Sequence, residues 1–314
     1  MYNVSWVVTI IATCISDVPF NGPIGGISVG LVDGEIVLMP NAKQKETNKL
    51  DLTLVCSREK VVMIEAGAHE VDETTMLNAI RTGHEEIKKF IDFVDMMVAE
   101  IGKPKYEFQH IEVDHDMFEA IKDFAIEKVR FALDTDDKNV REARLAPVVD
   151  EIHAKFDEEY PERAAEIDEC IYKLQKFVVR RWLLDDGKRV DGRGIDEIRP
   201  LAAEAGLFKR VHGSGMFTRG QTQVMTIATL GTVKEAQLLD GIDEEEFKRY
   251  MHHYNFPSYS VGETRPSRGP GRREIGHGAL AERALLPVIP SMEDFPYSLR
   301  LVSEVVSSNG STSQ

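Results

Sequence analysis

The 314-residue chain contains only three cysteines, and this scarcity already excludes several classes of protein. Cys14, Cys56 and Cys170 lie far apart and form no CxxC pair, so we expect neither a disulfide framework nor a cysteine metal site, and a reducing compartment fits better. Long apolar runs are equally scarce. The most apolar stretch, Val4–Ile15, is interrupted by hydroxyl residues, is too short to span a bilayer and lacks the basic start of a signal peptide.

Positive charge is also in short supply. The chain has 38 Lys and Arg against 53 Asp and Glu, which gives a formal net charge of −15 at pH 7. An acidic chain cannot hold a polyanion through its bulk charge, so binding of nucleic acid would require basic residues focused in one place. The hydrophobic share of 42% and the charged share of 29% are those of an ordinary globular protein, and the length suggests about two or three domains.

Hydrophobic periodicity divides the first two thirds of the chain into a strand region and a helical region. Residues 19–65 are typical of a β-meander of four short, mostly antiparallel strands, with a two-residue hairpin turn at Asp33-Gly34. From Met76 to Ile101 an apolar residue recurs every three or four positions, which predicts a helix of about seven turns that begins after Asp72. Residues 114–184 carry three more helical stripes and no strand pattern.

Glycines return near residue 186, and the pattern changes to that of a mixed α/β region. Met216–Leu230 is rich in Thr, Val, Ile and Gln, which favours a pair of strands, and Leu299–Val306 predicts another strand. Between them, Glu244–His253 is predicted to be helical. Ser258–Gly278 is rich in Gly, Pro and Arg and predicts a long ordered loop, and loops of that length are usually functional or disordered.

The segment Gly262–Gly278 is the densest cationic stretch of this acidic chain. Guanidinium groups match phosphate oxygens in a bidentate geometry, and glycines let the backbone approach a ligand closely. The alternative is a solvated basic loop whose arginines pair with nearby glutamates. The basic residues of the segment are Arg265, Arg268, Arg272, Arg273 and His277, and the nearby glutamates are Glu263, Glu274 and Glu282.

The end of the chain, Ser307–Gln314, is the second candidate. Small hydroxyl residues and glycine after a strand can present N–H and hydroxyl groups to an anion, although the segment is not a Walker A loop and a flexible terminus is the alternative. His252–Tyr259 combines histidines with aromatic residues and could bind metal or stack bases, but apolar packing accounts for it more simply. No carboxylate spacing marks a metal site, so the residues themselves predict no metal ligand.

Several ordered motifs resemble the polynucleotide phosphorylase family (polyribonucleotide nucleotidyltransferases). The motifs are Pro19–Ile24, Lys49–Leu52, Gly83–Glu86, Arg189–Arg193, Phe217–Gln223, His253–Pro257, Tyr259–Thr264, Arg272–Gly278 and Ser308–Ser313. The resemblance covers nearly the whole chain and implies an internal part of such an enzyme with an α+β fold. It implies the end of a first RNase PH-like core over residues 1–103, an all-helical domain over 104–185 and the start of a second RNase PH-like core over 186–314.

The resemblance also implies a function. Members of the family are phosphorolytic 3′-to-5′ exoribonucleases, in which phosphate attacks the RNA 3′ end and releases nucleoside diphosphates, and the reverse reaction polymerises them. By resemblance, Ser311, Thr312 and Ser313 hold the attacking phosphate. Arg272 and Arg273 hold phosphates of the RNA end or the anionic transition state, with His277 in support. The expected partners are the 3′ end of single-stranded RNA, inorganic phosphate, nucleoside diphosphates and two further copies in a homotrimer, in the cytoplasm and without a membrane.

Where the sequence departs from the family pattern, the expectation changes. The family's metal-binding aspartates and catalytic lysine follow the segment that resembles Ser308–Ser313, so the resemblance implies Mg²⁺ for the parent enzyme with ligands beyond residue 314, and an inactive 314-residue piece. One alternative is a non-catalytic RNA-binding or scaffold fragment. Another is a different RNase PH-type exoribonuclease subunit, against which residues 105–185 argue, because such subunits lack an inserted helical domain.

Overall fold

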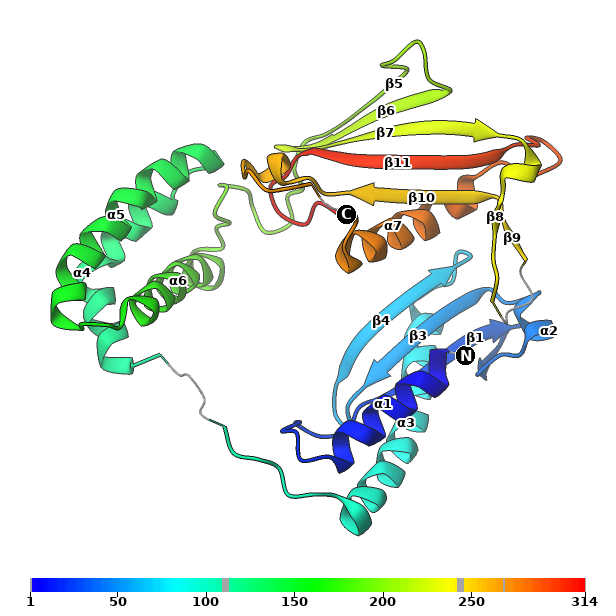
Figure 1. Cartoon of the computed structure of the whole chain (residues 1–314), viewed down its shortest axis with the longest axis horizontal. Coiled ribbons are helices and arrows are strands. Elements are labelled where there is room, and N and C mark those ends of the chain that lie inside the picture. Colours follow the sequence, from blue (N-terminus) through cyan, green and yellow to red (C-terminus); the bar gives the residue numbers. More distant parts are fainter. Residues whose placement is uncertain (1, 109–112, 242–245, 268, 314) are drawn as a thin grey trace. The chain divides into compact units, whose positions relative to one another are not determined.

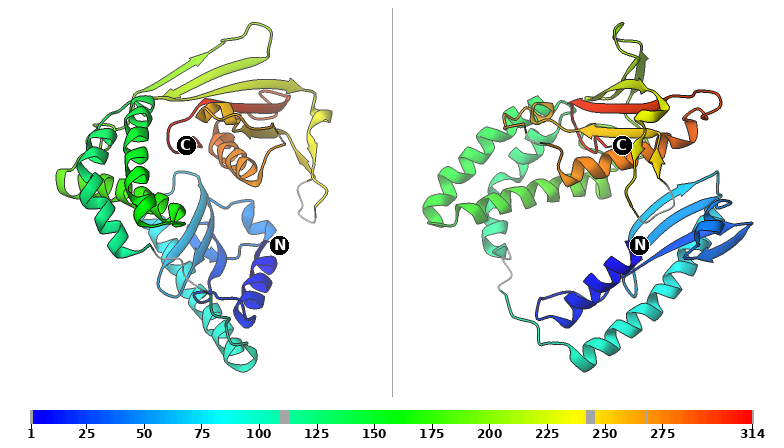
Figure 2. Two further views of the ribbon diagram at one scale, coloured as in Figure 1. Left: turned by 60° about the vertical axis from the view of Figure 1, so that its left-hand side comes forward. Right: turned by 45° about the vertical axis from the view of Figure 1, so that its right-hand side comes forward.

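The computed structural model describes residues 2–108, 113–241, 246–267 and 269–313. The chain forms two compact units, which Figures 1 and 2 draw as ribbons. The first unit comprises Met1–Gln109, Leu238–Lys248 and Arg283–Ile289. The second comprises His110–Gln237, Arg249–Glu282 and Pro290–Gln314.

The first unit contains a four-stranded antiparallel sheet that packs against a long helix. The strand order is β2-β1-β3-β4, so the prediction of four antiparallel strands is confirmed but the meander is wrong. In a meander β2 would pair with β3, whereas here β1 lies between them. The elements are α1 (Tyr2–Ile15), β1 (Gly25–Val32), β2 (Glu35–Leu38), α2 (Ala42–Lys45), β3 (Leu50–Cys56), β4 (Val61–Ala68) and α3 (Glu73–Ile101), with β8 (Gln237–Leu238) and β9 (Phe247–Lys248) as a separate strand pair.

Local sequence signals in this unit act as predicted. Asp33 and Gly34 both adopt positive φ in the hairpin turn. The side chain of Asp72 accepts a hydrogen bond of 3.0 Å from the N–H of Thr75 and so caps the start of α3. The apolar stripe of α3 packs on the sheet, with its buried residues Ala79, Ile87 and Ile91 against Ile27, Val29, Leu50, Leu52, Leu54 and Cys56.

The second unit begins with three helices, as the periodicity predicts. They are α4 (His115–Leu133), α5 (Lys138–Glu159) and α6 (Ala164–Arg181), and a short π-helical turn, Trp182–Asp186, follows them. Asp114 and Asp137 cap α4 and α5 through backbone N–H groups. The three apolar stripes meet in one core, whose fully buried members include Met117, Ile121, Ile152, Phe156, Ile167 and Leu174.

The rest of the second unit is a five-stranded mixed sheet. Its strand order is β10-β11-β7-β6-β5; β10 and β11 run parallel, and every other neighbouring pair is antiparallel. The parallel pair is joined through α7, as expected for a crossover. The strand pair predicted within Met216–Leu230 and the strand predicted at Leu299–Val306 are confirmed. The elements are β5 (Leu201–Ala205), β6 (Gly213–Arg219), β7 (Thr222–Gly231), β10 (Tyr250–Asn255), α7 (Arg272–Leu285) and β11 (Ser298–Ser307), with 3-10 turns at Val233–Glu235, Ser258–Val261 and Leu286–Val288.

Two predictions for this region are wrong. Glu244–His253 was expected to be helical, but its described part contains β9 and most of β10, while residues 244 and 245 lie outside the described ranges. The strand buries every second side chain, Tyr250, His252 and Tyr254, which is a period of two rather than 3.6. Ser258–Gly278 was expected to be a loop throughout, but α7 begins at Arg272.

The α+β fold class is confirmed, with helical and sheet regions in the predicted order. The domain boundaries at 103 and 185 stay predictions. Within the described ranges, no helix combines the length and the apolar character needed to cross a membrane.

Candidate anion-binding site

The arginine segment and the chain end lie at the same edge of the second sheet. This edge is the one at which the parallel strands β10 and β11 have their carboxyl ends. β10 and β11 are parallel neighbours, with Asn255 in register with Glu304, so their carboxyl ends lie at one edge. The segment that leads into α7 follows β10, and the serine-rich end follows β11. The two are tied together where they leave the sheet, because the N–H of Ser308 donates to the carbonyl of Ser260 at 2.9 Å.

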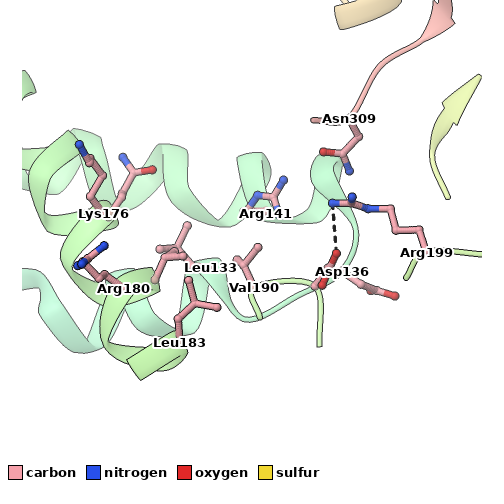
Figure 3. Close-up of a pocket in the computed structure, with 12 residues that line it drawn as sticks. Leu133, Asp136, Arg141, Lys176, Arg180, Leu183, Val190, Arg199 and Asn309 are labelled. Carbon is pink, nitrogen blue, oxygen red and sulfur yellow. Dashed lines mark ion pairs between the residues drawn. The ribbon is translucent and has the colours of Figure 1, made fainter. Parts of the chain in front are cut away.

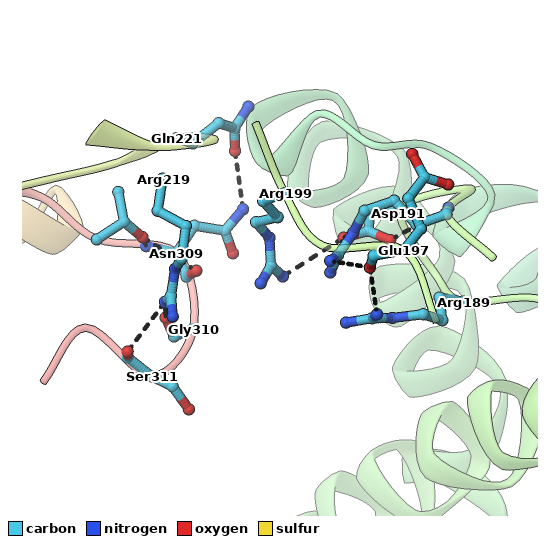
Figure 4. Close-up of polar contacts among 11 residues, drawn as sticks. Arg189, Asp191, Glu197, Arg199, Arg219, Gln221, Asn309, Gly310 and Ser311 are labelled. Atoms are coloured by element: carbon cyan, nitrogen blue, oxygen red, sulfur yellow. Dashed lines mark hydrogen bonds and ion pairs between the residues drawn. The ribbon is translucent and has the colours of Figure 1, made fainter. Parts of the chain in front are cut away.

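The chain end is held in a defined turn on the hairpin between β6 and β7. Arg219 donates from Nη2 to the carbonyls of Gly310 at 2.7 Å and Ser311 at 2.9 Å, as Figure 4 shows. Thr222 Oγ1 accepts from the N–H of Asn309 at 3.0 Å and donates to the carbonyl of the same residue at 3.2 Å. The alternative of a free, flexible terminus does not apply to the described part of this segment.

The turn directs backbone donors away from Arg219. Gly310 and Ser311 both have positive φ, at 70° and 33°, a conformation that favours glycine at the first position. In a trans peptide the C=O and N–H point to opposite sides. Since the carbonyls of Gly310 and Ser311 face Arg219, the N–H groups of Ser311 and Thr312 face the other way, and within the described residues no acceptor takes them. Adjacent outward N–H groups of this kind are suited to hold an anion.

The start of α7 is fixed to the end of β10 by one carboxylate. Glu274 accepts from the N–H of Gly271 at 2.8 Å with Oε2, and from the N–H of Phe256 at 2.8 Å with Oε1. This places Arg272 and Arg273, the first two residues of the helix, beside the edge at which β10 ends. Glu274 is therefore committed to backbone donors and does not neutralise the arginines, contrary to one alternative for this segment.

The arginines of the predicted cluster have different surroundings. Arg265 pairs with Glu263 at 2.7 Å, as the alternative interpretation expected. Arg272 and Arg273 are exposed and have no ion pair among the residues that the structure describes. Arg268 lies outside the described residues. Among described residues, no hydrogen bond or ion pair links Arg272 or Arg273 to the serine–threonine cluster, so the two groups share an edge without contacting each other.

His277 lies one turn after Arg273 and faces the sheet. Its ring meets the ring of Tyr254 edge-on, with the centroids 5.2 Å apart, and its Nδ1 is buried without a hydrogen-bond partner in the described part of the chain. The next residue, Gly278, allows the close packing, since a Cβ there would lie 3.0 Å from the carbonyl oxygen of His252. Burial raises the pKa of the Tyr254 hydroxyl to about 12, against the opposing charge of Arg273.

Sequence reasoning assigned no role to a second basic group near the chain end, shown in Figure 4. Asp191 accepts from Arg193 Nε at 2.8 Å and pairs with Arg199 at 3.4 Å. Burial raises the pKa of Asp191, but hydrogen bonds and charge from Arg193 outweigh it, so the net pKa is lowered. Burial and the neighbouring arginines lower the pKa of Arg199.

This basic group lies next to the chain end, because Arg199 Nη2 is 4.0 Å from the position that a Cβ on Gly310 would occupy. The motifs containing Arg193 and Arg219 were noted in the sequence, but their contact with the chain end requires the fold.

A buried polar chain lies inside the same sheet. Tyr250 OH lies 2.9 Å from His252 Nδ1, His252 Nε2 lies 2.8 Å from Ser303 Oγ, and Ser303 Oγ lies 2.7 Å from Thr226 Oγ1. The pKa of His252 is lowered, chiefly because burial disfavours its charged form. His252 is thus occupied by internal hydrogen bonds, in line with the packing that the sequence favoured over metal or base binding for this segment.

In the described ranges, no three His, Cys, Asp or Glu side chains gather closely enough to hold an ion. The described residues therefore do not by themselves fit the Mg²⁺ that the resemblance implies.

Models of known protein families match three regions that together make up most of the chain. Residues 22–86 match the 3′ exoribonuclease family, domain 2, and residues 197–314 match the 3′ exoribonuclease family, domain 1. Residues 116–194, which contain α4–α6, match the polyribonucleotide nucleotidyltransferase RNA binding domain. The order of the three matches is the order that the sequence motifs predicted.

Individual relatives decide the assignment. The polyribonucleotide nucleotidyltransferases of Ruminiclostridium cellulolyticum and Lachnoclostridium phytofermentans are each 56% identical, and that of Caldicellulosiruptor saccharolyticus is 53% identical, over 97% of this chain. The chain belongs to the polyribonucleotide nucleotidyltransferase family. It spans 43–44% of the length of these relatives.

Proposed function

We propose that the complete protein degrades RNA from its 3′ end by phosphorolysis. An oxygen of inorganic phosphate attacks the phosphorus of the last phosphodiester, and the bond from that phosphorus to the 3′ oxygen of the preceding nucleotide breaks. The terminal nucleotide leaves as a nucleoside diphosphate, and the shortened RNA keeps a 3′ hydroxyl. The reverse reaction extends RNA from nucleoside diphosphates.

This reaction requires two anions to approach each other. The attacking phosphate and the phosphodiester repel, so preorganised donors and cations are the main catalytic resource of such a site. In our proposal Ser311, Thr312 and Ser313 hold the attacking phosphate, with the outward N–H groups of the turn contributing. Arg272 and Arg273 hold phosphates of the RNA end. His277 positions Arg273 by filling the space between α7 and β10.

The observation that carries the proposal is the common edge of β10 and β11. It puts two unpaired guanidinium groups and a preorganised hydroxyl-rich turn at the same end of one parallel strand pair. Crevices at the carboxyl ends of parallel strands are a recurrent place for ligands in α/β sheets.

Three further features of the complete protein rest on the family resemblance. They are a requirement for Mg²⁺, assembly into a homotrimer and a place in the cytoplasm. The described residues supply no metal cluster. The three cysteines are unpaired and buried, in keeping with a reducing compartment.

The decisive experiment uses the complete protein, with a chain as long as those of its relatives. It measures the phosphate-dependent release of ADP from oligo(A). Arg272→Ala/Arg273→Ala is expected to weaken RNA binding and to flatten its dependence on salt, by about 0.7 in log–log slope for each lost phosphate contact. The matched control is Arg265→Ala, because that guanidinium is already paired with Glu263 and its side chain is 71% exposed. An unchanged slope and rate in the double variant would remove the arginine pair from the site.

The non-catalytic alternative predicts a different result. A scaffold binds oligo(A) but releases no ADP when phosphate is added, and its affinity does not respond to phosphate. A phosphorolytic site gives ADP in proportion to phosphate, and release of AMP without phosphate would indicate hydrolysis instead.

A further inference from the structure

A cavity of about 430 Å³ lies in the second unit, next to the chain-end turn, which contributes Asn309 to its lining. Its walls come from the end of α4, from α5 and α6, and from residues 190–199, and Asn309 closes one side (Figure 3). The volume falls in the range of small-molecule sites, roughly 300–1,000 Å³. None of the residues proposed above to hold phosphate or the RNA end lines it.

The floor of the cavity is apolar. Leu133, Val179, Leu183 and Val190 line it, and Figure 3 shows Leu133, Leu183 and Val190 near its centre. Leu183 is 42% exposed although it is a large aliphatic residue. A flat, apolar ligand surface would cover this floor and remove it from water.

The rim of the cavity is cationic, which is unusual for a chain with a net charge of −15. Four basic residues line it against two carboxylates, Asp136 and Asp191. Arg199 is paired with Asp191, but the other three basic residues, Arg141, Lys176 and Arg180, have no ion pair among the described residues. Unpaired cations beside an apolar surface favour a ligand that carries both an anion and a ring.

Two amide side chains complete the lining. Gln175 projects from α6, and Asn309 donates from Nδ2 to Gln221 at 2.8 Å, which leaves its carbonyl oxygen available as an acceptor. Amides can hydrogen-bond to the edges of a base. An apolar ligand would form no ion pair with the cations and no hydrogen bond with the amides, and inorganic phosphate would leave the floor uncovered.

We propose that this cavity binds a nucleotide, with the base on the apolar floor and the phosphate against Arg141, Lys176 and Arg180. A free nucleotide and a nucleotide unit of an RNA chain share this chemistry, and the experiment below separates them. The site goes beyond the proposed phosphorolytic function, because none of the residues assigned to the reacting phosphates lines it.

The test measures binding of ADP, oligo(A) and inorganic phosphate to the 314-residue chain by calorimetry at low salt. Lys176→Glu and Arg180→Glu reverse a rim charge and are expected to weaken nucleotide binding about tenfold or more, because a charge-assisted contact is replaced by repulsion. Lys173→Glu is the matched control. Lys173 is an exposed lysine of the same helix, one turn earlier, and does not line the cavity, so the same charge reversal there is expected to leave affinity within about twofold.

A second variant tests the floor. Leu183→Asn removes apolar surface at an exposed position and is expected to weaken ADP binding while leaving binding of inorganic phosphate unchanged. If ADP binds no more tightly than phosphate, the base makes no contact and the proposal fails.

The ligands distinguish the two sources. Loss of ADP binding in both rim variants supports a free nucleotide, and loss of oligo(A) binding alone supports a nucleotide unit of RNA. The proposal is overturned if neither ligand distinguishes the rim variants from Lys173→Glu. It is equally overturned if ADP binding is lost in Arg272→Ala/Arg273→Ala and retained in the rim variants, because the nucleotide then occupies the edge site.

Discussion

The helical segment α4–α6 and the sheet β10-β11-β7-β6-β5 differ in the polarity of their buried side chains. The core of the helices consists of apolar side chains, with Phe156 and Leu174 essentially inaccessible. The buried polar side chains recorded among the described residues all belong to the sheet region, and they are Thr222, His252, Ser260, Ser298 and Ser303. Apolar packing gives stability with little directional constraint, whereas buried hydrogen bonds fix positions and are costly when broken. Of the buried polar residues, Thr222 contacts the chain end directly, through its two hydrogen bonds with Asn309.

Two histidines show the same contrast. His153 lies on α5 between Asp157 at 3.0 Å and Asp168 at 3.1 Å, and its hydrogen bond to the Asp157 carboxylate is the main reason that its pKa is raised. His252 is buried in the sheet, where desolvation lowers its pKa. The two residues shift in opposite directions because one is surrounded by carboxylates and the other by protein interior.

The largest effect is expected from the apolar interior. Phe156→Ala removes a side chain that is 1% exposed and packs edge-on against Phe124 with ring centroids 5.7 Å apart. The free energy of unfolding of the helical segment should fall by about 3–5 kcal/mol, because transfer and cavity costs add. Denaturant unfolding followed by circular dichroism measures it.

The control for this change is Phe131→Ala on α4, whose side chain is 68% exposed. Its only recorded ring contact in the described chain is with Arg144, and the cost should stay below about 1 kcal/mol. Equal losses in the two variants would contradict an apolar core centred on Phe156.

A smaller effect is expected when the polar interior is broken. Ser303→Ala deprives His252 and Thr226 of a buried partner, which should cost about 1–3 kcal/mol. Ser298→Ala is a matched control on the same strand, because Ser298 Oγ is buried without a hydrogen-bond partner among described residues. Urea midpoints of the two variants test the difference, and a Ser298→Ala loss as large as that of Ser303→Ala would show that the hydrogen bonds are not the cause.

The smallest effect concerns pH and has opposite signs in the two regions. The raised pKa of His153 contributes stability that is complete below 6.5 and is lost as pH rises through its folded pKa. For His252 the folded pKa is lowered, so below 6.5 the unfolded chain takes up a proton that the folded chain does not. Acid therefore lowers the free energy of unfolding through this residue. After correction for the intrinsic, base-catalysed exchange rate, acidification from pH 7.5 to 5.5 should therefore raise the protection of amides in α5 and α6 and lower it in β10 and β11. The change in the free energy of opening should be about 1 kcal/mol or less.

His153→Gln and His252→Gln each serve as the control for the other region. The difference between each variant and the unchanged chain isolates one histidine from the remaining titrating groups. Parallel shifts of both regions with pH in all variants would refute the contrast.

The sequence was most informative where short-range signals dominate. Asp72 and the stripe that ends at Ile101 located α3 almost to the residue, because capping and a period of 3.6 both act within one helix. The three helices of the second unit followed from the same periodicity. The family motifs added the order of the regions, which no local pattern contains.

The errors arose where distant segments decide the structure. β10 was mistaken for a helix because Tyr250 and His252 are not recognisably apolar. Their alternation becomes visible only when β11 pairs beside the strand and α7 packs against it. The start of α7 was mistaken for a loop because Gly276 and Gly278 lower helix propensity. The structure shows why a glycine is needed at 278, since β10 passes too close for a Cβ. The supporting bonds from Arg219 to the chain end span about 90 residues and could not be derived from local sequence.

The double use of Glu274 has a practical consequence for protein engineering. Because this carboxylate joins Phe256 directly to Gly271, the position of Arg272 does not depend on the length of the chain between them. A fluorophore or an affinity tag inserted after Gly262 should leave the basic start of α7 in place, and would thus report on ligand binding at the proposed site without altering its residues.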